Sequence, residues 1–140
     1  MDAPSQPPSV FDRLPMPPSA ALLGWTLRAI DHDARTIEIG FELDERFINP
    51  GGSIQGGFVA AMLDDTQGPA LFGTSDGKIY APTIDFHITF IRPAMPGKFI
   101  GKGRVVSLGK TIVITEADLF DEAGILLAKG SFTNRRMEAA

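Results

Sequence analysis

The pattern of apolar and polar residues predicts one long helix in a chain that otherwise has strand character. Residues 55–72 are free enough of breaking residues for such a helix, and nearly every residue before Asp64 is apolar or small. We therefore expect this helix to be buried. At about 100° per residue, its bulky and its small side chains gather on opposite faces. The bulky face comprises Phe58, Val59, Met62, Leu63 and Ala70, and the small face comprises Gly57, Ala60, Ala61, Asp64 and Gly68.

Asp64 stands among small residues on the second of these faces. A partner subunit, another backbone or a thin ligand can come close to the helix there, so the carboxylate can be partly desolvated and still be contacted. The alternative is that Asp64 lies on a solvated helix face. The neighbouring Asp65 lies at the margin of the bulky face and is the weaker candidate.

Alternating and β-branched residues predict strands on both sides of the helix, at residues 25–30, 36–43, 79–93, 99–108, 111–121 and 125–134. Turn residues 31–34, with His32 among them, join the first two as a hairpin, and we expect the last four to form an antiparallel meander with turns at 95–97, 109–110 and 121–124. The order predicts an α+β fold in which an antiparallel six-stranded sheet wraps one long central helix. On residues 84–91 the alternation places Ile84, Phe86, Ile88 and Phe90 on one face and Asp85, His87 and Thr89 on the other.

The first 18 residues form a proline-rich extension, and residues 19–136 form a single domain. Six prolines in the extension argue against regular helix or strand there, and Phe11, Leu14 and Met16 are the residues expected to dock it. Ser19 is expected to cap a short helical turn that Gly24 ends.

Composition narrows the function classes. A chain of 140 residues with 44% hydrophobic and 21% charged residues is typical of one globular domain, without an apolar run long enough to span a membrane. A net charge of -4 argues against nucleic acid as the main partner. The absence of cysteine excludes disulfides and thiolate metal sites, and two isolated histidines make a metal cluster unconvincing, so we expect no metal. Without a signal pattern, the chain is expected to be cytoplasmic.

The start of the long helix supplies candidate chemistry. Gly56 and Gly57 lack a Cβ, so an anion or a carbonyl oxygen can approach the unpaired amides and the positive end of the helix dipole, as in an oxyanion hole. The alternative is an ordinary flexible helix entry. Asp64 lies about nine residues on, roughly 13 Å along the axis, too far for both groups of one helix to act on one atom. If they cooperate, they come from two antiparallel helices of a dimer.

Three motifs together resemble those of the hotdog-fold acyl-CoA thioesterases, in the branch of the phenylacetate-degradation proteins and the human thioesterase superfamily members. They are Asn49-x5-Gln55-Gly56-Gly57-x6-Asp64, Thr83-Ile-Asp85-Phe-His-Ile-Thr-Phe90-Ile-Arg-Pro93-Ala and Leu108-Gly-Lys110-Thr111. The resemblance covers residues 25–135. It implies hydrolysis of an acyl-CoA, with an aromatic or a short to medium-chain acyl group, to the free acid and CoA, without a cofactor.

The resemblance also implies roles for individual residues. The Gly56 N–H and Asn49 would polarise the thioester carbonyl, Asp64 of the facing subunit would attack it or activate water, and Thr83 would orient that water. Asn49 has the alternative of capping a turn in its own loop. The acyl pocket is expected to depend on Phe58, Met62, Phe72 and the N-terminal segment. Positions that match CoA-contacting segments are Gly57, Asp85, Phe90, Ser107, Leu108, Gly109, Lys110, Thr111, Ile112 and Arg135.

Among these, Lys110 and Arg135 would meet the CoA phosphates, unless they are simply solvated. The assembly implied by the resemblance is a homodimer, paired further into a dimer of dimers.

Gln55 departs from the pattern, because that branch has histidine at this position. Glutamine keeps an N–H donor but cannot titrate, so altered substrate choice, low activity and loss of catalysis are all open. The departure motivates a rival hypothesis, a non-catalytic module that binds or senses acyl-CoA. A hotdog hydratase would instead be expected to carry an Asp and His pair at the helix start, which the sequence lacks.

Overall fold

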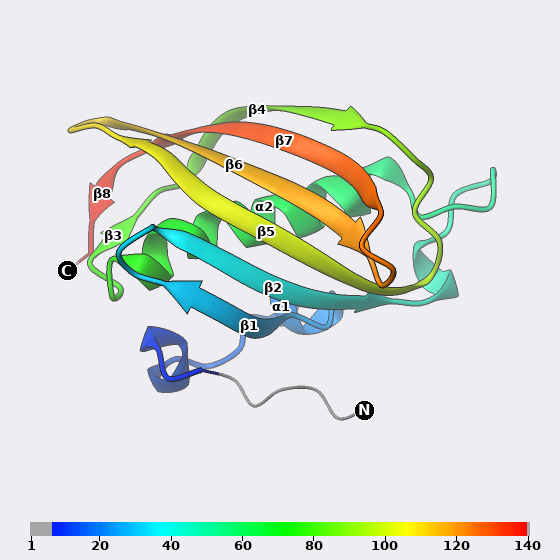
Figure 1. Ribbon diagram of the computed structural model, residues 1–140, viewed down its shortest axis with the longest axis horizontal. Helices are drawn as coiled ribbons and strands as arrows, with labels where there is room; N and C mark the ends of the chain where they lie inside the picture. The colour runs from blue at the N-terminus through cyan, green and yellow to red at the C-terminus, as the bar shows by residue number, and fades with distance from the viewer. Residues whose placement is uncertain (1–6, 140) are drawn as a thin grey trace.

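The long predicted helix is α2, Gly56–Thr74, and it lies across one face of a six-stranded antiparallel sheet (Figure 1). The computed structural model describes residues 7–139. The sheet comprises β1 (Thr26–Asp31), β2 (Thr36–Leu43), β4 (Thr83–Phe90), β5 (Gly97–Leu108), β6 (Ile112–Asp121) and β7 (Leu126–Arg135). The other elements are η1 (Val10–Arg13), α1 (Pro18–Leu22), η2 (Glu45–Phe47) and the paired short strands β3 (Ile79–Tyr80) and β8 (Met137–Glu138). The predicted α+β fold is confirmed.

The order of strands is β1-β2-β5-β6-β7-β4, so the expectation of a four-strand meander was wrong. Of the strands expected in the meander, only β5, β6 and β7 follow one another as hairpins. The predicted strand 79–93 divides at residues 81–82 into β3 and β4, and β4 then pairs with β7 at the edge of the sheet. Its place beside β5 is taken by β2, which pairs from Thr36↔Arg104 to Leu43↔Gly97 without a register shift. The segment around Met95-Pro-Gly97 is therefore a crossover and not a hairpin turn.

Glycines on β5 allow α2 to approach the sheet closely. A Cβ at Gly101 would collide with the Thr66 hydroxyl, and one at Gly103 would meet the Thr66 carbonyl at 3.0 Å. The bulky face of α2, with Val59, Met62 and Leu63, is buried against the sheet as predicted. In the described part of the chain, no helix has the length and apolar character needed to cross a membrane.

Pro69 inside α2 leaves a backbone acceptor free. Proline has no N–H, so the carbonyl of Asp65, four residues earlier, lacks its usual helical donor. The indole Nε1 of Trp25 donates to this carbonyl at 3.0 Å. The helix continues to Thr74, and this hydrogen bond holds Trp25 beside Asp65.

The proline-rich segment is less irregular than expected, because residues 10–13 form the 3-10 helix η1, capped by Ser9. Phe11 anchors it, with its ring 5.2 Å from Trp25 and 6.0 Å from Phe72. The next helix, α1, begins at Pro18 with Pro17 at its N-cap, so Ser19 is not the cap. Residues 1–6 of the predicted extension lie outside the described residues.

Candidate active site

The Asp64 carboxylate projects from the middle of α2 and is held through one of its two oxygens. Oδ1 accepts hydrogen bonds from Gln67 Nε2 at 2.8 Å and from the Thr83 hydroxyl at 2.9 Å. Within residues 7–139, no side chain or backbone N–H donates to Oδ2. The result is a carboxylate that is oriented but keeps one oxygen available to a ligand or to water.

A buried polar network behind Asp64 fixes the orientation of the Gln67 amide. The Thr115 hydroxyl donates to Gln67 Oε1, and Asn134 Nδ2 donates to Thr115 Oγ1 at 3.1 Å and to the Val113 carbonyl at 3.2 Å. Gln67, Thr115 and Asn134 are all buried. Because the amide oxygen of Gln67 faces Thr115, the NH₂ group of Gln67 must face Asp64 and Thr83. It donates to the Thr83 hydroxyl oxygen at 3.2 Å as well as to Asp64.

A β-bulge brings Thr83 to this network. On β7, Asn134 and Phe132 are buried, and they pair with Thr83 and Phe86 of β4. Between these pairs the register shifts at Ile84, which is the extra residue. Strict alternation would put Thr83 on the opposite face from Phe86, but the bulge turns both toward the helix. Thr83 Oγ1 consequently lies 3.2 Å from Asn134 Oδ1 as well as next to Asp64.

A pocket of about 720 Å³ opens beside Asp64. Its polar lining includes Asp64, Asp65, Gln67 and Thr83. The apolar lining comes largely from the N-terminal segment, the end of α2 and the β3–β4 connection, and includes Phe11, Leu14, Met16, Trp25, Phe72, Tyr80 and Pro82. This shape and composition suit a small organic ligand.

Of the three residues expected to set the depth of an acyl pocket, one lines this cavity. Phe72 lines it, whereas Met62 is buried in the core and Phe58 packs against Phe47, with ring centroids 4.8 Å apart. The N-terminal segment also contributes to the wall of this cavity.

Asp65 is a second carboxyl in the same pocket. Burial and, to a smaller extent, the neighbouring Asp64 carboxylate raise the pKa of Asp65 to about 7. Its Oδ2 is shielded from solvent and has no hydrogen-bond partner within the described residues. The two adjacent acids therefore differ: Asp64 accepts two hydrogen bonds, whereas Asp65 is more buried and has an oxygen without a donor.

The start of α2 presents free amides, as the sequence predicts. Gln55 is the N-cap residue, and its side chain makes no capping hydrogen bond. The first helical donors with partners are Phe58 and Val59, which both donate to the Gln55 carbonyl, so the N–H groups of Gly56 and Gly57 have no acceptor in residues 7–139. Such amides at the positive end of a helix can bind an oxyanion.

Asn49 serves its own loop in this structure. Its Oδ1 accepts hydrogen bonds from the Gly51 N–H at 2.9 Å and from the Ser53 N–H at 3.3 Å. Its Nδ2 has one long contact of 3.5 Å, to Ser53 Oγ. The side-chain oxygen of Asn49 therefore caps the turn, as the alternative holds, while its NH₂ group can still donate to a ligand.

Gly56 and Asp64 belong to different parts of the chain's surface. Gly56 lies against Phe90 at the end of β4, because a Cβ on Gly56 would come within 3.3 Å of that ring. Asp64 lies instead beside Thr83, at the opposite end of the same strand. The two groups are thus separated by about the length of β4, and a single chain does not bring them together.

The positions that match CoA-contacting segments fall into two groups. Gly57, Asp85 and Phe90 lie on the start of α2 and on β4. The other group lies at the end of the β5–β6 hairpin, where Ile112 pairs with Arg135 on β7. It includes Ser107, Leu108, Gly109, Lys110, Thr111, Ile112 and Arg135.

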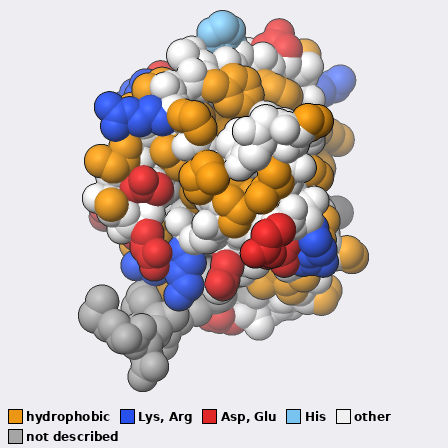
Figure 2. Space-filling model, turned by 90° about the vertical axis from the view of Figure 1, so that its right-hand side faces the viewer, with side chains coloured by type: hydrophobic (Ala, Val, Ile, Leu, Met, Phe, Trp, Pro, Cys, Tyr) orange, Lys and Arg blue, Asp and Glu red, His pale blue; other side chains and the backbone are white. Residues whose placement is uncertain are grey.

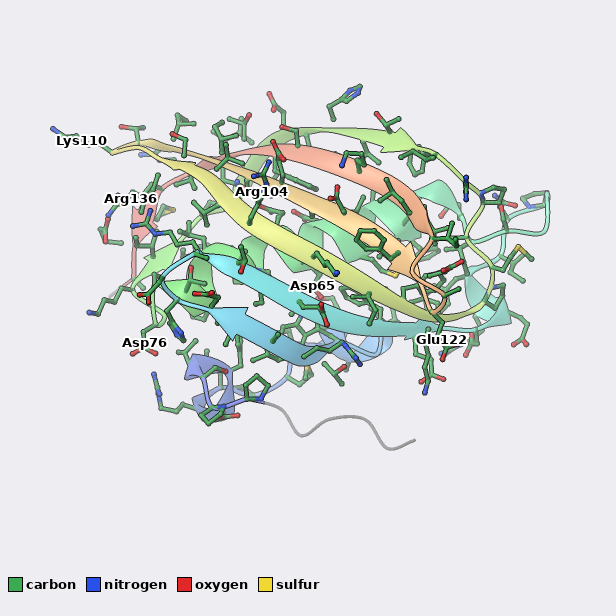
Figure 3. The ribbon with its side chains drawn as sticks, in the orientation of Figure 1. Asp65, Asp76, Arg104, Lys110, Glu122 and Arg136 are labelled. Carbon is green, nitrogen blue, oxygen red and sulfur yellow. The ribbon has the colours of Figure 1, made fainter. Side chains whose placement is uncertain are left out.

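Lys110 and Arg135 are exposed, and neither forms an ion pair with another residue of 7–139. Figure 3 shows Lys110 at the tip of the hairpin and Arg136, which the sequence did not single out, at the same end of the molecule. Arg136 is tied to the hairpin because its N–H donates to the Thr111 carbonyl at 2.7 Å, and its side chain pairs with Glu138. These cations make this end suitable for an anionic ligand.

Sequence reasoning missed the supports of the site. Gln67 follows Asp64 by three residues on one helix face, so helical spacing offered a signal for that pair. Thr115 and Asn134 come from different strands, and only the strand register reveals their contact. Asp65 was rated the weaker carboxylate because periodicity cannot show what covers it.

The chain matches the model of the thioesterase superfamily over residues 51–128. Acyl-coenzyme A thioesterase 13 from Homo sapiens is 33% identical over 96 residues, which are 66% of this chain and 66% of that protein. The chain spans just under two thirds of the length of the first curated relatives it matches.

Solved structures give the same picture. A phenylacetic acid degradation-related protein from Ralstonia eutropha JMP134 is 30% identical, with a TM-score of 0.81 over 90% of this chain and 95% of that one. The structure of smu.793 from Streptococcus mutans UA159 was determined bound to acetyl CoA. It is 17% identical, with a TM-score of 0.72 over 81% of this chain and 89% of that one, and therefore shows likeness of fold alone.

Proposed function

Because the chain belongs to the thioesterase superfamily, we propose that it hydrolyses an acyl-CoA thioester. Water and the thioester give the free carboxylic acid and CoA; the C–S bond breaks, a C–O bond forms, and the thiol sulfur takes up a proton from water. The observation that carries the proposal is the oriented Asp64 carboxylate, anchored at Oδ1 and open at Oδ2, on the edge of a largely apolar pocket.

Asp64 is the group we assign to the attack. Its open Oδ2 either adds to the thioester carbonyl directly or takes the proton of a water molecule that adds instead. The Thr83 hydroxyl and the Gln67 amide keep the carboxylate in one orientation, which reduces the entropy that the reaction must lose. In the direct route, hydrolysis of the acyl-enzyme anhydride by water restores Asp64.

The oxyanion is assigned to the Gly56 N–H of the partner subunit, because Gly56 and Asp64 are far apart in one chain. The edge strand β4 supports a dimer of this kind. One side of its backbone is unpaired, and it exposes large apolar residues: Ile84 is 57% exposed, Phe86 51% and Phe90 55%. An unpaired apolar edge is a template for pairing with another chain.

The two-fold axis of the proposed dimer can be placed near the middle of β4. If β4 pairs antiparallel with its own copy about His87, residues equally far from 87 face each other. Residue 84 then lies opposite residue 90 of the partner subunit. Gly56 of the partner, which contacts that Phe90 ring, is thereby brought to the Thr83 and Asp64 end. One symmetric contact would complete two sites.

Further exposed apolar residues follow β4 toward the start of α2. They are Ile91, Met95 and Ile48. Figure 2 shows hydrophobic side chains gathered on this end of the molecule. Covering them in an assembly would add apolar burial to the backbone pairing of β4.

CoA is assigned to the hairpin end, where Lys110 and Arg135 carry positive charge without an ion pair among residues 7–139. The CoA phosphates offer the negative charge that such side chains bind. A dimer of dimers and a cytoplasmic location stay predictions.

The rival function is binding of acyl-CoA without turnover, and Gln55 motivates it. Its side chain makes no capping hydrogen bond and lies beside Gly57, with Oε1 3.3 Å from where a Cβ would stand. It can donate a hydrogen bond near the thioester but cannot transfer a proton. In the proposed mechanism it needs only to donate, because Asp64 supplies the base.

A panel of aromatic, short-chain and medium-chain acyl-CoA esters, assayed for release of free thiol, tests the proposal. We expect turnover of at least one class, with loss of about 10³ in kcat in Asp64→Asn and an unchanged fold. Ester binding without thiol release from any member of the panel would contradict hydrolysis and favour the binding module. Asp33→Asn, in the exposed β1–β2 turn and not part of the pocket lining, is the matched control.

A further inference from the structure

Asp65 is a carboxyl in the pocket that the proposed mechanism does not use. Neither of its side-chain oxygens accepts a hydrogen bond from a residue in the described part of the chain, and Oδ2 is shielded from solvent. The indole N–H of Trp25 donates to the backbone carbonyl of Asp65, which has no helical donor because residue 69 is proline, and so is not available to the carboxyl. A desolvated carboxyl without a donor is unfavourable, and a donor on a bound molecule would remove that cost.

The apolar walls around Asp65 allow this one polar group to distinguish between ligands. Phe11, Trp25, Phe72 and Tyr80 line the pocket with aromatic surface, and Leu14, Met16 and Pro82 add aliphatic surface. In such a pocket a few polar groups fix the orientation of the ligand and distinguish it from analogues of the same size. An analogue that left Asp65 unpaired would lose the hydrogen bond and keep the desolvation cost.

We propose that Asp65 is a specificity-determining residue, which accepts a hydrogen bond from an O–H or N–H group on the acyl part of the substrate. The inference rests on the proposed function, because it gives this pocket to the acyl group of the thioester that Asp64 attacks. Successive helical side chains diverge by about 100°, which puts the two carboxyl groups roughly 6 to 7 Å apart. A donor on the far side of an aromatic ring attached near the thioester spans a comparable length.

The test uses phenylacetyl-CoA esters that carry a 4-hydroxyl, a 4-amino or a 4-methoxy group. The hydroxyl and the amine can donate, whereas the methoxy group of similar size only accepts. The assay is run at pH 8, above the pKa of Asp65 of about 7, so that the carboxylate acts only as an acceptor. Comparison of the hydroxyl with the amine tells an O–H from an N–H donor.

In the wild type we expect kcat/KM to be at least about tenfold higher for a donor-bearing ester than for the methoxy ester, as for a hydrogen bond to a charged group. Asp65→Leu should bring this ratio close to one, and Asp65→Asn, which keeps an amide oxygen as acceptor, should retain a preference. Asp33→Leu, in the exposed β1–β2 turn, should leave the ratio unchanged. Equal rates in the wild type, or a ratio that survives Asp65→Leu, would overturn the assignment. Should Asp65→Leu not fold, the wild-type ratio and Asp65→Asn decide.

A binding experiment separates this inference from the proposed function. If the protein cleaves none of these phenylacetyl esters, the wider acyl-CoA panel decides whether it is a hydrolase. Calorimetry with 4-hydroxy-, 4-amino- and 4-methoxyphenylacetamide then tests Asp65 alone. A preference of at least about tenfold for a donor-bearing amide, lost in Asp65→Leu, supports the assignment. Equal affinities for the three amides overturn it.

Discussion

Nε2 of Gln67 lies 2.8 Å from Oδ1 of Asp64, one turn earlier on α2. The relationship is set from the other side of the amide, because the Thr115 hydroxyl donates to the Gln67 oxygen and leaves the nitrogen facing the carboxylate. Thr115 on β6 thus fixes the orientation of the Gln67 amide, and the amide in turn orients the Asp64 carboxylate. The buried core in this way determines the geometry of the proposed attack.

Gln67→Met should separate this role from simple stability. Methionine fills a similar volume but cannot donate to Asp64 or accept from Thr115, so we expect a loss of about 1 to 3 kcal/mol in the free energy of unfolding and about a tenfold fall in kcat. Urea denaturation and thiol release measure the two. Thr66→Val is the matched control, because it removes another buried hydrogen bond of α2, to the Met62 carbonyl, without touching Asp64. Equal kcat values in the two variants would contradict the positioning role.

Phe86→Lys should dissociate the proposed dimer. The side chain lies near the middle of the unpaired edge strand β4 and is half exposed, while the rest of its ring packs on Phe132. Circular dichroism therefore has to show that the variant is folded. Pairing about His87 would bring two added charges close together, and their repulsion opposes association. Sedimentation velocity should show a lone subunit, with thiol release lost. Ile125→Lys, at the exposed β6–β7 turn, should change neither; a Phe86→Lys protein that stays dimeric would place the interface elsewhere.

Asp65→Asn should stabilise the protein at high pH. Burial, with a smaller contribution from Asp64, raises the pKa of Asp65 from 3.8 to about 7, so the folded chain binds more protons than the unfolded chain between these values. Stability therefore falls as the pH rises through this window, and the cost is complete above about pH 7. At pH 8 we expect Asp65→Asn to gain about 1 to 2 kcal/mol, after allowance for solvent screening of the partly exposed carboxyl.

Near pH 4 that gain should vanish, because the native carboxyl is then protonated when folded. Urea denaturation at both pH values measures the difference, with Asp33→Asn as the exposed control. A gain of the same size at both pH values would mean that Asp65 is not the titrating group.

The pattern of side chains predicted most of the elements, because burial imposes period 2 on strands and period 3.6 on helices. The extent of α2 and the small-residue face around Asp64 follow from that rule. Strand order does not, since a turn such as Met95-Pro-Gly97 permits either a hairpin or a crossover. Long-range pairing of β2 with β5 decided between the two.

The site was predicted as far as local spacing carries. Thr83 was named from a resemblance, yet alternation alone places it on the wrong face, and the bulge at Ile84 that corrects this has no local signal. The contact of Asn134 with Thr115 depends on the register of β6 with β7. The burial of Asp65 depends on Trp25 and the N-terminal segment, which lie over it but are distant in sequence.

The central claim is that each site takes Asp64 from one subunit and the Gly56 N–H from the other. Gly56→Pro removes that N–H at the first helical position, where proline is well tolerated. The preceding Gln55 already has φ -58 and ψ 138, which suits a residue before proline. Gly56→Ala is the matched control, because it places a Cβ against Phe90 but keeps the N–H.

The most direct measurement is thiol release by a refolded equal mixture of Asp64→Asn and Gly56→Pro chains. Each variant alone should be inactive, and Gly56→Ala should be active. Random pairing makes half of the dimers mixed, each with one intact site of two, so the mixture should recover about a quarter of wild-type activity. A mixture no more active than its parents would contradict a site shared between subunits.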